Sequence, residues 1–130
     1  MPRSVRLQPL SLLIAHVLLK GPSSLKIIRM VVDTGATTTI IPPQIAVAIG
    51  CDPAKRSGRT AIITASGLEY LPVVTIPLVE CLGYRVRSLK AACHDLPPQS
   101  MVDGLLGLDF LSHVPSFRRF HNEIHRLTQE

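Results

Sequence analysis

Proline and glycine interrupt this chain so often that long helices have little room to form. The sequence holds 11 prolines and 8 glycines in 130 residues, and they recur along its whole length. A proline inside a helix removes a backbone hydrogen bond, and clusters of the two residues mark turns. The runs between them are short and rich in apolar and β-branched residues, as in strands. We therefore predict an all-β fold that contains one or two short helices.

The length of 130 residues suits one domain with a real core, and we predict a single domain over residues 1–130. Its core is expected at about 11–114, followed by a tail at 115–130. Hydrophobic residues make up 46% and charged residues 18%, a balance that argues against disorder. The mean hydropathy of +0.30 is high for a small monomer and indicates that a partner covers part of the apolar surface.

Apolar and β-branched runs between the turns predict a series of strands. They are expected at 11–20, 25–32, 38–41, 60–64, 69–78, 79–82 and 84–93. Short helices are expected at 44–49, where Gly50 provides the stop, and at 108–113. The segment 65–68, with Gly67 at its tip, joins two strands into a hairpin long enough to project from the body.

The tail at 115–130 allows two interpretations. Four of its apolar residues match the stripe of an amphipathic helix: Phe117, Phe120, Ile124 and Leu127. Segments 116–120 and 124–128 could instead form two strands around a turn. We favour this hairpin.

The charge pattern and the cysteines argue against several kinds of site. The net charge is +5, but the basic residues are scattered and aromatic content is only 4%, so we expect no nucleic-acid partner. Cys51, Cys81 and Cys93 form no paired framework and no C-x-x-C motif, which indicates reduced thiols in a cytoplasmic compartment. The glutamate between His121 and His125 is one position away from that of an H-E-x-x-H zinc site. We expect neither a metal nor another cofactor.

The apolar run at 12–19 is too short to span a bilayer, and His16 interrupts it. The residues after it do not form a small-residue cleavage site, so a signal peptide is not convincing. We expect a buried strand here and no membrane span, with export as the alternative.

A carboxylate stands where an apolar strand is expected to end. Asp33-Thr34-Gly35-Ala36 follows the apolar run at 27–32, and Gly35 tolerates the sharp turn that such a position needs. Thr34 adds a hydroxyl that can hydrogen-bond near the turn. A polar group at the end of a buried strand must find partners or stay hydrated. The residues alone leave two interpretations, a solvated aspartate in an ordinary turn or a functional carboxylate.

A second motif lies about 70 residues after Asp33. Leu105 and Leu106 form an apolar pair between Gly104 and Gly107, and such glycines let two backbone segments approach closely. Plain core packing is also compatible with this pattern.

In their order along 11–114, these segments resemble the retropepsin-like aspartic proteases, and bacterial or cellular members in particular. The segment 31–36 looks like the active-site motif of that family, and 60–78 looks like its flap. Gly104-Leu105-Leu106-Gly107 resembles the element that closes a ψ-shaped structure around the catalytic loop. The resemblance implies one lobe of the acid-protease fold, a closed β barrel.

The resemblance further implies an aspartic endopeptidase, which hydrolyses peptide bonds with two carboxyl groups that share one proton. Of the five aspartates in the sequence, Asp33 alone stands in an Asp-Thr-Gly motif. Asp109 is expected to cap a helix or to lie at the surface. The second carboxyl group must therefore come from another copy of the chain, and a homodimer is implied.

The resemblance also assigns roles to individual residues. Asp33 is the catalytic residue, Thr34 hydrogen-bonds to the other subunit, and Gly35 and Ala36 complete the active-site loop beside the substrate. The flap over an extended peptide or protein substrate has its tip at Ala65, Ser66, Gly67 and Leu68. The loop is supported by Leu105, Leu106 and Gly107.

Some residues depart from the viral pattern. Thr37 stands where many viral members have an acid, and the flap tip lacks their run of glycines. The longer tail leaves open whether terminal strands form the interface. The alternative to a protease is an inactive, protease-like module for dimerisation or peptide binding.

Overall fold

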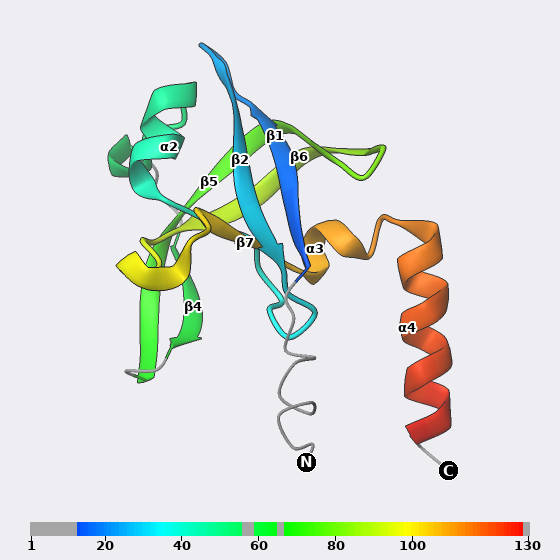
Figure 1. Cartoon of the computed structure of the whole chain (residues 1–130). Helices are drawn as coiled ribbons and strands as arrows, with labels where there is room; N and C mark the ends of the chain where they lie inside the picture. The colour runs from blue at the N-terminus through cyan, green and yellow to red at the C-terminus, as the bar shows by residue number, and fades with distance from the viewer. Residues whose placement is uncertain (1–12, 56–58, 65–66, 129–130) are drawn as a thin grey trace.

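The computed structural model of the chain describes residues 13–55, 59–64 and 67–128 (Figure 1). Its strands are β1 (Ile14–Lys20), β2 (Leu25–Val32), β3 (Ile40–Ile41), β4 (Arg59–Thr64), β5 (Gly67–Cys81), β6 (Tyr84–Cys93) and β7 (Gly104–Leu106). Its helices are α2 (Pro43–Ile49), α3 (Leu108–Leu111) and α4 (Pro115–Thr128), with 3₁₀ turns η2 (Pro53–Lys55) and η3 (Pro98–Ser100). None of the helices that the structure describes has the length and apolar character needed to cross a membrane. The mainly β fold predicted from the sequence is confirmed.

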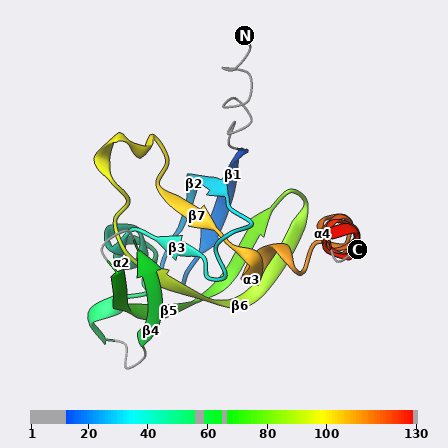
Figure 2. The same cartoon turned by 90° about the horizontal axis from the view of Figure 1, so that it is seen from below.

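Six of the strands close into a barrel, in the order β1-β2-β7-β3-β6-β5 and back to β1. The closing contact pairs residues 18–20 of β1 with 78–80 of β5. Closure removes the unpaired strand edges that an open sheet would expose. β4 stands outside the ring and pairs with the first part of β5, so the β4–β5 hairpin projects from the barrel (Figures 1 and 2). The predicted closed barrel is confirmed.

Alternation along β1 shows how the sequence fills the barrel. Ala15, Val17 and Leu19 are buried, whereas His16 and Lys20 face outward. Buried apolar residues of α3 complete the same core. Burial of one large apolar side chain contributes about 1.5–3 kcal/mol to stability.

β5 runs as one strand of 15 residues where the sequence predicts two. Pro77 lies inside it and has no N–H to donate, and the pairing with β6 skips this position. In the same gap Ser88 has a φ of 56°. Val86 and Leu89 are both buried although they are three positions apart, so the ribbon bends here and keeps its apolar side chains inside.

The tail forms the helix α4, and the hairpin predicted for it is wrong. An isolated hairpin is only marginally stable in water. A hairpin in the tail would gain stability by pairing with a free strand edge. Among the described strands that edge belongs to β4, which lies across the molecule from the tail (Figure 2). Pro115 fits the first turn of a helix, and the N–H of Arg118 donates to the carbonyl oxygen of Val114 at 2.9 Å. The short α3 ends at Leu111, two residues earlier than predicted.

The three cysteines are free and buried, and burial raises the pKa of Cys93 from 9.0 to about 11, with a smaller contribution from Cys51. The unfolded chain releases this proton above about pH 9 while the folded protein keeps it, so stability falls as the pH rises from 9 to 11. We expect this thiol to remove about 2 kcal/mol of the free energy of unfolding over that window.

Urea titrations under reducing conditions, at pH 8 and at about pH 11, measure this loss for the wild type and for Cys93→Ala. Between the two pH values, the free energy of unfolding of Cys93→Ala should fall by about 2 kcal/mol less than that of the wild type. Equal losses in the two proteins would contradict the prediction.

Candidate active site

Three strands meet where the catalytic loop is expected. β2 leads directly into the loop, and its residues 30–32 pair in parallel with 104–106 of β7. β3 follows the loop and pairs with β7 through Ile40 and Leu105. β7 thus lies between the strands that enter and leave the loop, which is the ψ-shaped arrangement expected for this motif. β3 is confined to two residues, so the first half of the predicted strand at 38–41 belongs to the loop.

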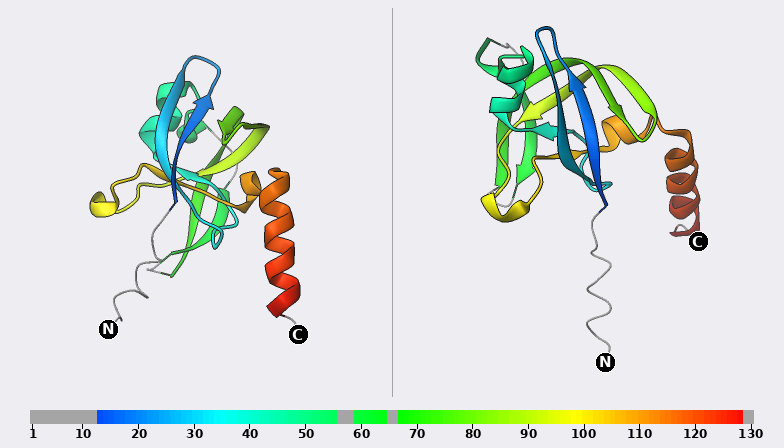
Figure 3. Two further views of the ribbon diagram at one scale, coloured as in Figure 1. Left: turned by 45° about the vertical axis from the view of Figure 1, so that its right-hand side comes forward. Right: turned by 45° about the horizontal axis from the view of Figure 1, so that its top comes forward.

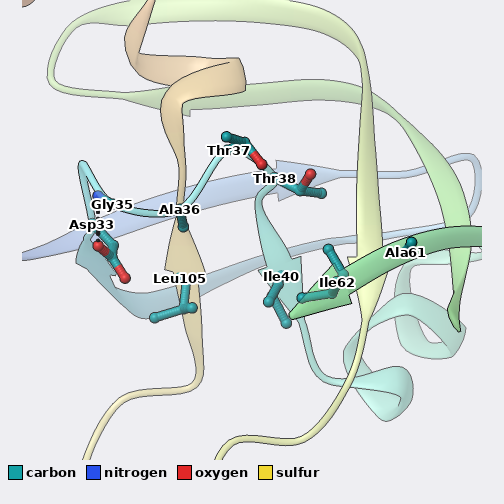
Figure 4. Close-up of a pocket in the computed structure, with 9 residues that line it drawn as sticks. All are labelled: Asp33, Gly35, Ala36, Thr37, Thr38, Ile40, Ala61, Ile62 and Leu105. Atoms are coloured by element: carbon teal, nitrogen blue, oxygen red, sulfur yellow. Dashed lines mark hydrogen bonds between the residues drawn. The ribbon is translucent and has the colours of Figure 1, made fainter. Parts of the chain in front are cut away.

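Backbone hydrogen bonds fix the position of Asp33. Its N–H donates to the carbonyl oxygen of Leu106 at 3.0 Å, which ties the start of the loop to β7. Its Oδ1 accepts from the N–H of Gly35 at 2.9 Å, and its carbonyl oxygen accepts from the N–H of Ala36 at 3.2 Å. Asp33 is half-buried, while Thr34 and Gly35 are exposed. The carboxyl group is therefore oriented by its own turn and remains accessible (Figure 4).

A buried polar network holds the far end of the loop. Thr39 is fully buried, and its hydroxyl donates to Oδ1 of Asp109 at 2.6 Å while its N–H donates to Oδ2 at 2.9 Å. The same hydroxyl accepts from the N–H of Gly107 at 3.1 Å. Asp109 is half-buried and lies within the first turn of α3, and the capping position before the helix is Gly107, which makes no side-chain cap. The capping or surface role predicted for Asp109 is wrong, because its carboxylate braces the loop instead.

Gly107 brings the chain after β7 into contact with the loop that holds Asp33. A Cβ atom at this position would lie 2.8 Å from the carbonyl oxygen of Ala36. The N–H of Leu108 donates to that same oxygen at 2.8 Å, so the contact also carries a hydrogen bond. Leu106 is fully buried and Leu105 is half-buried. The motif therefore serves both core packing and the close approach of two backbones.

Asp33 lines two hollows. The first has a volume of about 410 Å³ and lies between the catalytic loop and β4 (Figure 4). The second, also of about 410 Å³, lies on the side of η3 and has mainly apolar walls that include Leu96 and Val102. Asp33 and Leu105 line both hollows.

The β4–β5 hairpin contributes to the first hollow through β4. Ala61 and Ile62 line it (Figure 4), and Ile62, like Leu105, packs against a small buried cluster that contains Ile40. The site residues predicted from the sequence do not include these two, nor Thr37, Thr38 and Ile40, which also line the hollow. Strand periodicity alone does not reveal how far a hairpin folds back over a loop.

The predicted tip of the flap is described only in part. Ala65 and Ser66 lie outside the described residues, and Thr64 pairs with Gly67 on either side of them. Gly67 has a φ of 117°, which glycine adopts without strain. Leu68 is 59% exposed, and neither Gly67 nor Leu68 lines the two hollows around Asp33.

The described residues contain no group of three or more His, Cys, Asp or Glu that could hold a metal ion. A closed barrel in which a ψ-shaped crossing holds an Asp-Thr-Gly loop defines the retropepsin-like class of proteins. A family model described as “gag-polyprotein putative aspartyl protease” matches residues 24–113, a range that contains the loop, the hairpin and β7. The chain belongs to this family of aspartyl proteases.

Among solved structures, the fold is similar to the crystal structure of a retropepsin-like aspartic protease from Rickettsia conorii. The TM-score is 0.53 with 20% sequence identity, over 78% of this chain and 82% of that chain. No curated protein matches the sequence.

Proposed function

We propose that the protein is an aspartic endopeptidase in which Asp33 from each of two copies forms one catalytic dyad. The observation that carries the proposal is the placement of Asp33. Its carboxyl group is half-buried, oriented by the N–H of Gly35, and set on the border of two hollows. A single chain supplies one such group, and the mechanism of the class needs two.

The chemistry follows from two carboxyl groups at hydrogen-bond distance. They share one proton, because two like charges so close cannot both be ionised. The ionised member takes a proton from water, which attacks the peptide carbonyl, and the protonated member donates to the carbonyl oxygen. The first carboxyl group then gives its proton to the amide nitrogen, the C–N bond breaks and the amine leaves, while the second takes a proton back as the carboxylic acid product forms. Thr34, exposed in the single chain, would hydrogen-bond to the other subunit and hold the two loops together.

The substrate would be an extended peptide or protein segment with apolar side chains beside the cleaved bond. The apolar walls of the second hollow, with Leu96 and Val102, suit such a side chain. The flap, with its tip at 65–68, would cover the peptide and add backbone hydrogen bonds. Gly35 and Ala36 would line the substrate path, and Leu105-Leu106-Gly107 would support the loop from behind.

We further propose that residues 1–130 act as one domain, without a cofactor, in a reducing compartment such as the cytoplasm. The three buried free thiols support the choice of compartment.

A binding module is the second candidate. One chain holds one Asp-Thr-Gly motif, so cleavage depends on a correctly aligned dimer. A chain that does not form such a dimer could bind a peptide in the hollows without cleaving it. Digestion of a peptide library at several pH values, followed by mass spectrometry, separates the two. Cleavage that pepstatin inhibits supports the protease, whereas saturable binding without turnover supports the module.

A further inference from the structure

α4 extends away from the barrel instead of packing along it (Figures 1 and 3). In the described part of the chain, no other helix or strand lies along α4. Its attachment is at the first turn, where Arg118 bonds to Val114 and Phe117 packs, partly buried, against the core. Most helical stability in proteins comes from packing of an apolar face, and a helix of 14 residues is marginal by itself. A second surface is therefore needed for the rest of α4.

The sequence of α4 provides an apolar face for such a surface. Positions 117, 120, 124 and 127 share one side of the helix and are all Phe, Ile or Leu. The charged residues lie off this stripe, and Arg126 donates to Glu123 at 2.8 Å. Leu127, at the far end of the stripe, is 60% exposed. Phe117 packs against the core of its own chain, so we name the positions beyond it, 120, 124 and 127, the α4 stripe.

α4 points the same way as the catalytic loop. In Figure 1 the loop after β2 forms the lower end of the barrel, and α4 runs further down beside it. Both views in Figure 3 show α4 continuing past the loop. Seen from below in Figure 2, the loop lies between the β4–β5 hairpin and α4, which is viewed end-on. The space in front of Asp33 is thus flanked by two projecting elements.

A dyad places a second copy of the chain in this space. Two Asp33 carboxyl groups can share a proton only if the copy approaches the face from which the loop, the hairpin and α4 project. A two-fold contact uses the same patch on both copies, so each α4 extends alongside the other subunit. The mean hydropathy of +0.30 is in keeping with apolar surface that a partner covers.

We propose that α4 is the dimerisation arm, and that the α4 stripe packs against the second copy of this chain. The inference rests on the proposed function, because the Asp33 dyad fixes where the second copy lies. It assigns the main inter-subunit contact to the part of α4 beyond its first turn.

Sedimentation equilibrium of the full chain measures the dimer dissociation constant. Leu127→Glu should raise it at least about tenfold, and Ile124→Glu combined with Leu127→Glu at least about a hundredfold, because each places a charge in a desolvated contact. Asn122→Glu is the matched control, because it adds the same charge to an exposed position on the other side of α4. It should change the dimer dissociation constant by less than about twofold. Because Leu127 is exposed in the single chain, its replacement should leave the circular dichroism spectrum unchanged.

The outcomes separate this inference from the proposed function. A dimer whose dissociation constant is the same in both stripe variants overturns the inference, whether or not it cleaves peptides. If the stripe variants dissociate the dimer, the inference is supported even when no peptide is cleaved. The absence of cleavage would then contradict only the proposed function. A wild-type chain that stays monomeric but binds phosphatidylserine vesicles through α4 overturns the inference in favour of a membrane surface.

Discussion

Replacement of Asp33 by asparagine is expected to lower the rate of peptide cleavage at least about a thousandfold. Proton transfer by a positioned carboxyl group contributes about 10²–10⁴-fold, and an amide cannot take a proton from water. The fold should persist, because the Oδ1 atom of asparagine can still accept from the N–H of Gly35. The dimer should be at least as stable as the wild type, since the conflict between two like charges disappears.

The measurement is the steady-state rate on a peptide found in the library digestion, together with thermal unfolding of each protein. Asp95→Asn is the matched control, because Asp95 is exposed and lies outside the two hollows at Asp33. It should cleave at nearly the wild-type rate. Pepstatin-sensitive cleavage that persists in Asp33→Asn would contradict the assignment of Asp33.

Replacement of Thr39 by valine is expected to lower the free energy of unfolding by about 3 kcal/mol. Valine fills nearly the same space but has no hydroxyl, so the buried N–H of Gly107 loses its acceptor and Asp109 loses its donor at 2.6 Å. An unsatisfied buried group costs about 1–3 kcal/mol, and a hydrogen bond to a charged group contributes about 1.5–3 kcal/mol. Cleavage should also slow by at least about tenfold, because this network holds one end of the catalytic loop.

Urea denaturation gives the stability, and cleavage of the same peptide gives the rate. Thr75→Val makes the same chemical change at an exposed position of β5 and should alter stability by less than about 0.5 kcal/mol. If Thr39→Val also changed stability by less than about 1 kcal/mol, the network would not be bracing the loop.

The sequence predicts the position of the loop at Asp33–Ala36 well because the requirements of such a turn are local. An apolar strand, an aspartate and a glycine two residues later suffice to place a carboxyl group at a turn that the Gly35 N–H then orients. The Gly104-Leu105-Leu106-Gly107 pattern similarly indicates a close approach of backbones, although it does not name Ala36 as the group approached. Closure of the barrel follows from the resemblance to the retropepsin-like family.

Contacts between distant segments could not be predicted in the same way. The bond between Thr39 and Asp109 joins residues 70 positions apart, and nothing in either local pattern distinguishes a brace from a helix cap. The contribution of Ala61 and Ile62 to the first hollow depends on how the hairpin folds back. In the tail, the sequence does show the apolar pattern of a helix. It does not show that the closed barrel leaves the tail no nearby strand edge to pair with, and this is what disfavours a hairpin.

Subunit mixing tests whether two copies of the chain share one catalytic site. Wild-type and Asp33→Asn chains are mixed at constant total concentration, allowed to exchange subunits, and assayed for cleavage. If one dyad needs Asp33 from both copies, activity falls as the square of the wild-type fraction, so an equal mixture retains about one quarter. A linear fall, with about one half retained in the equal mixture, would show that each chain acts alone and would contradict the account.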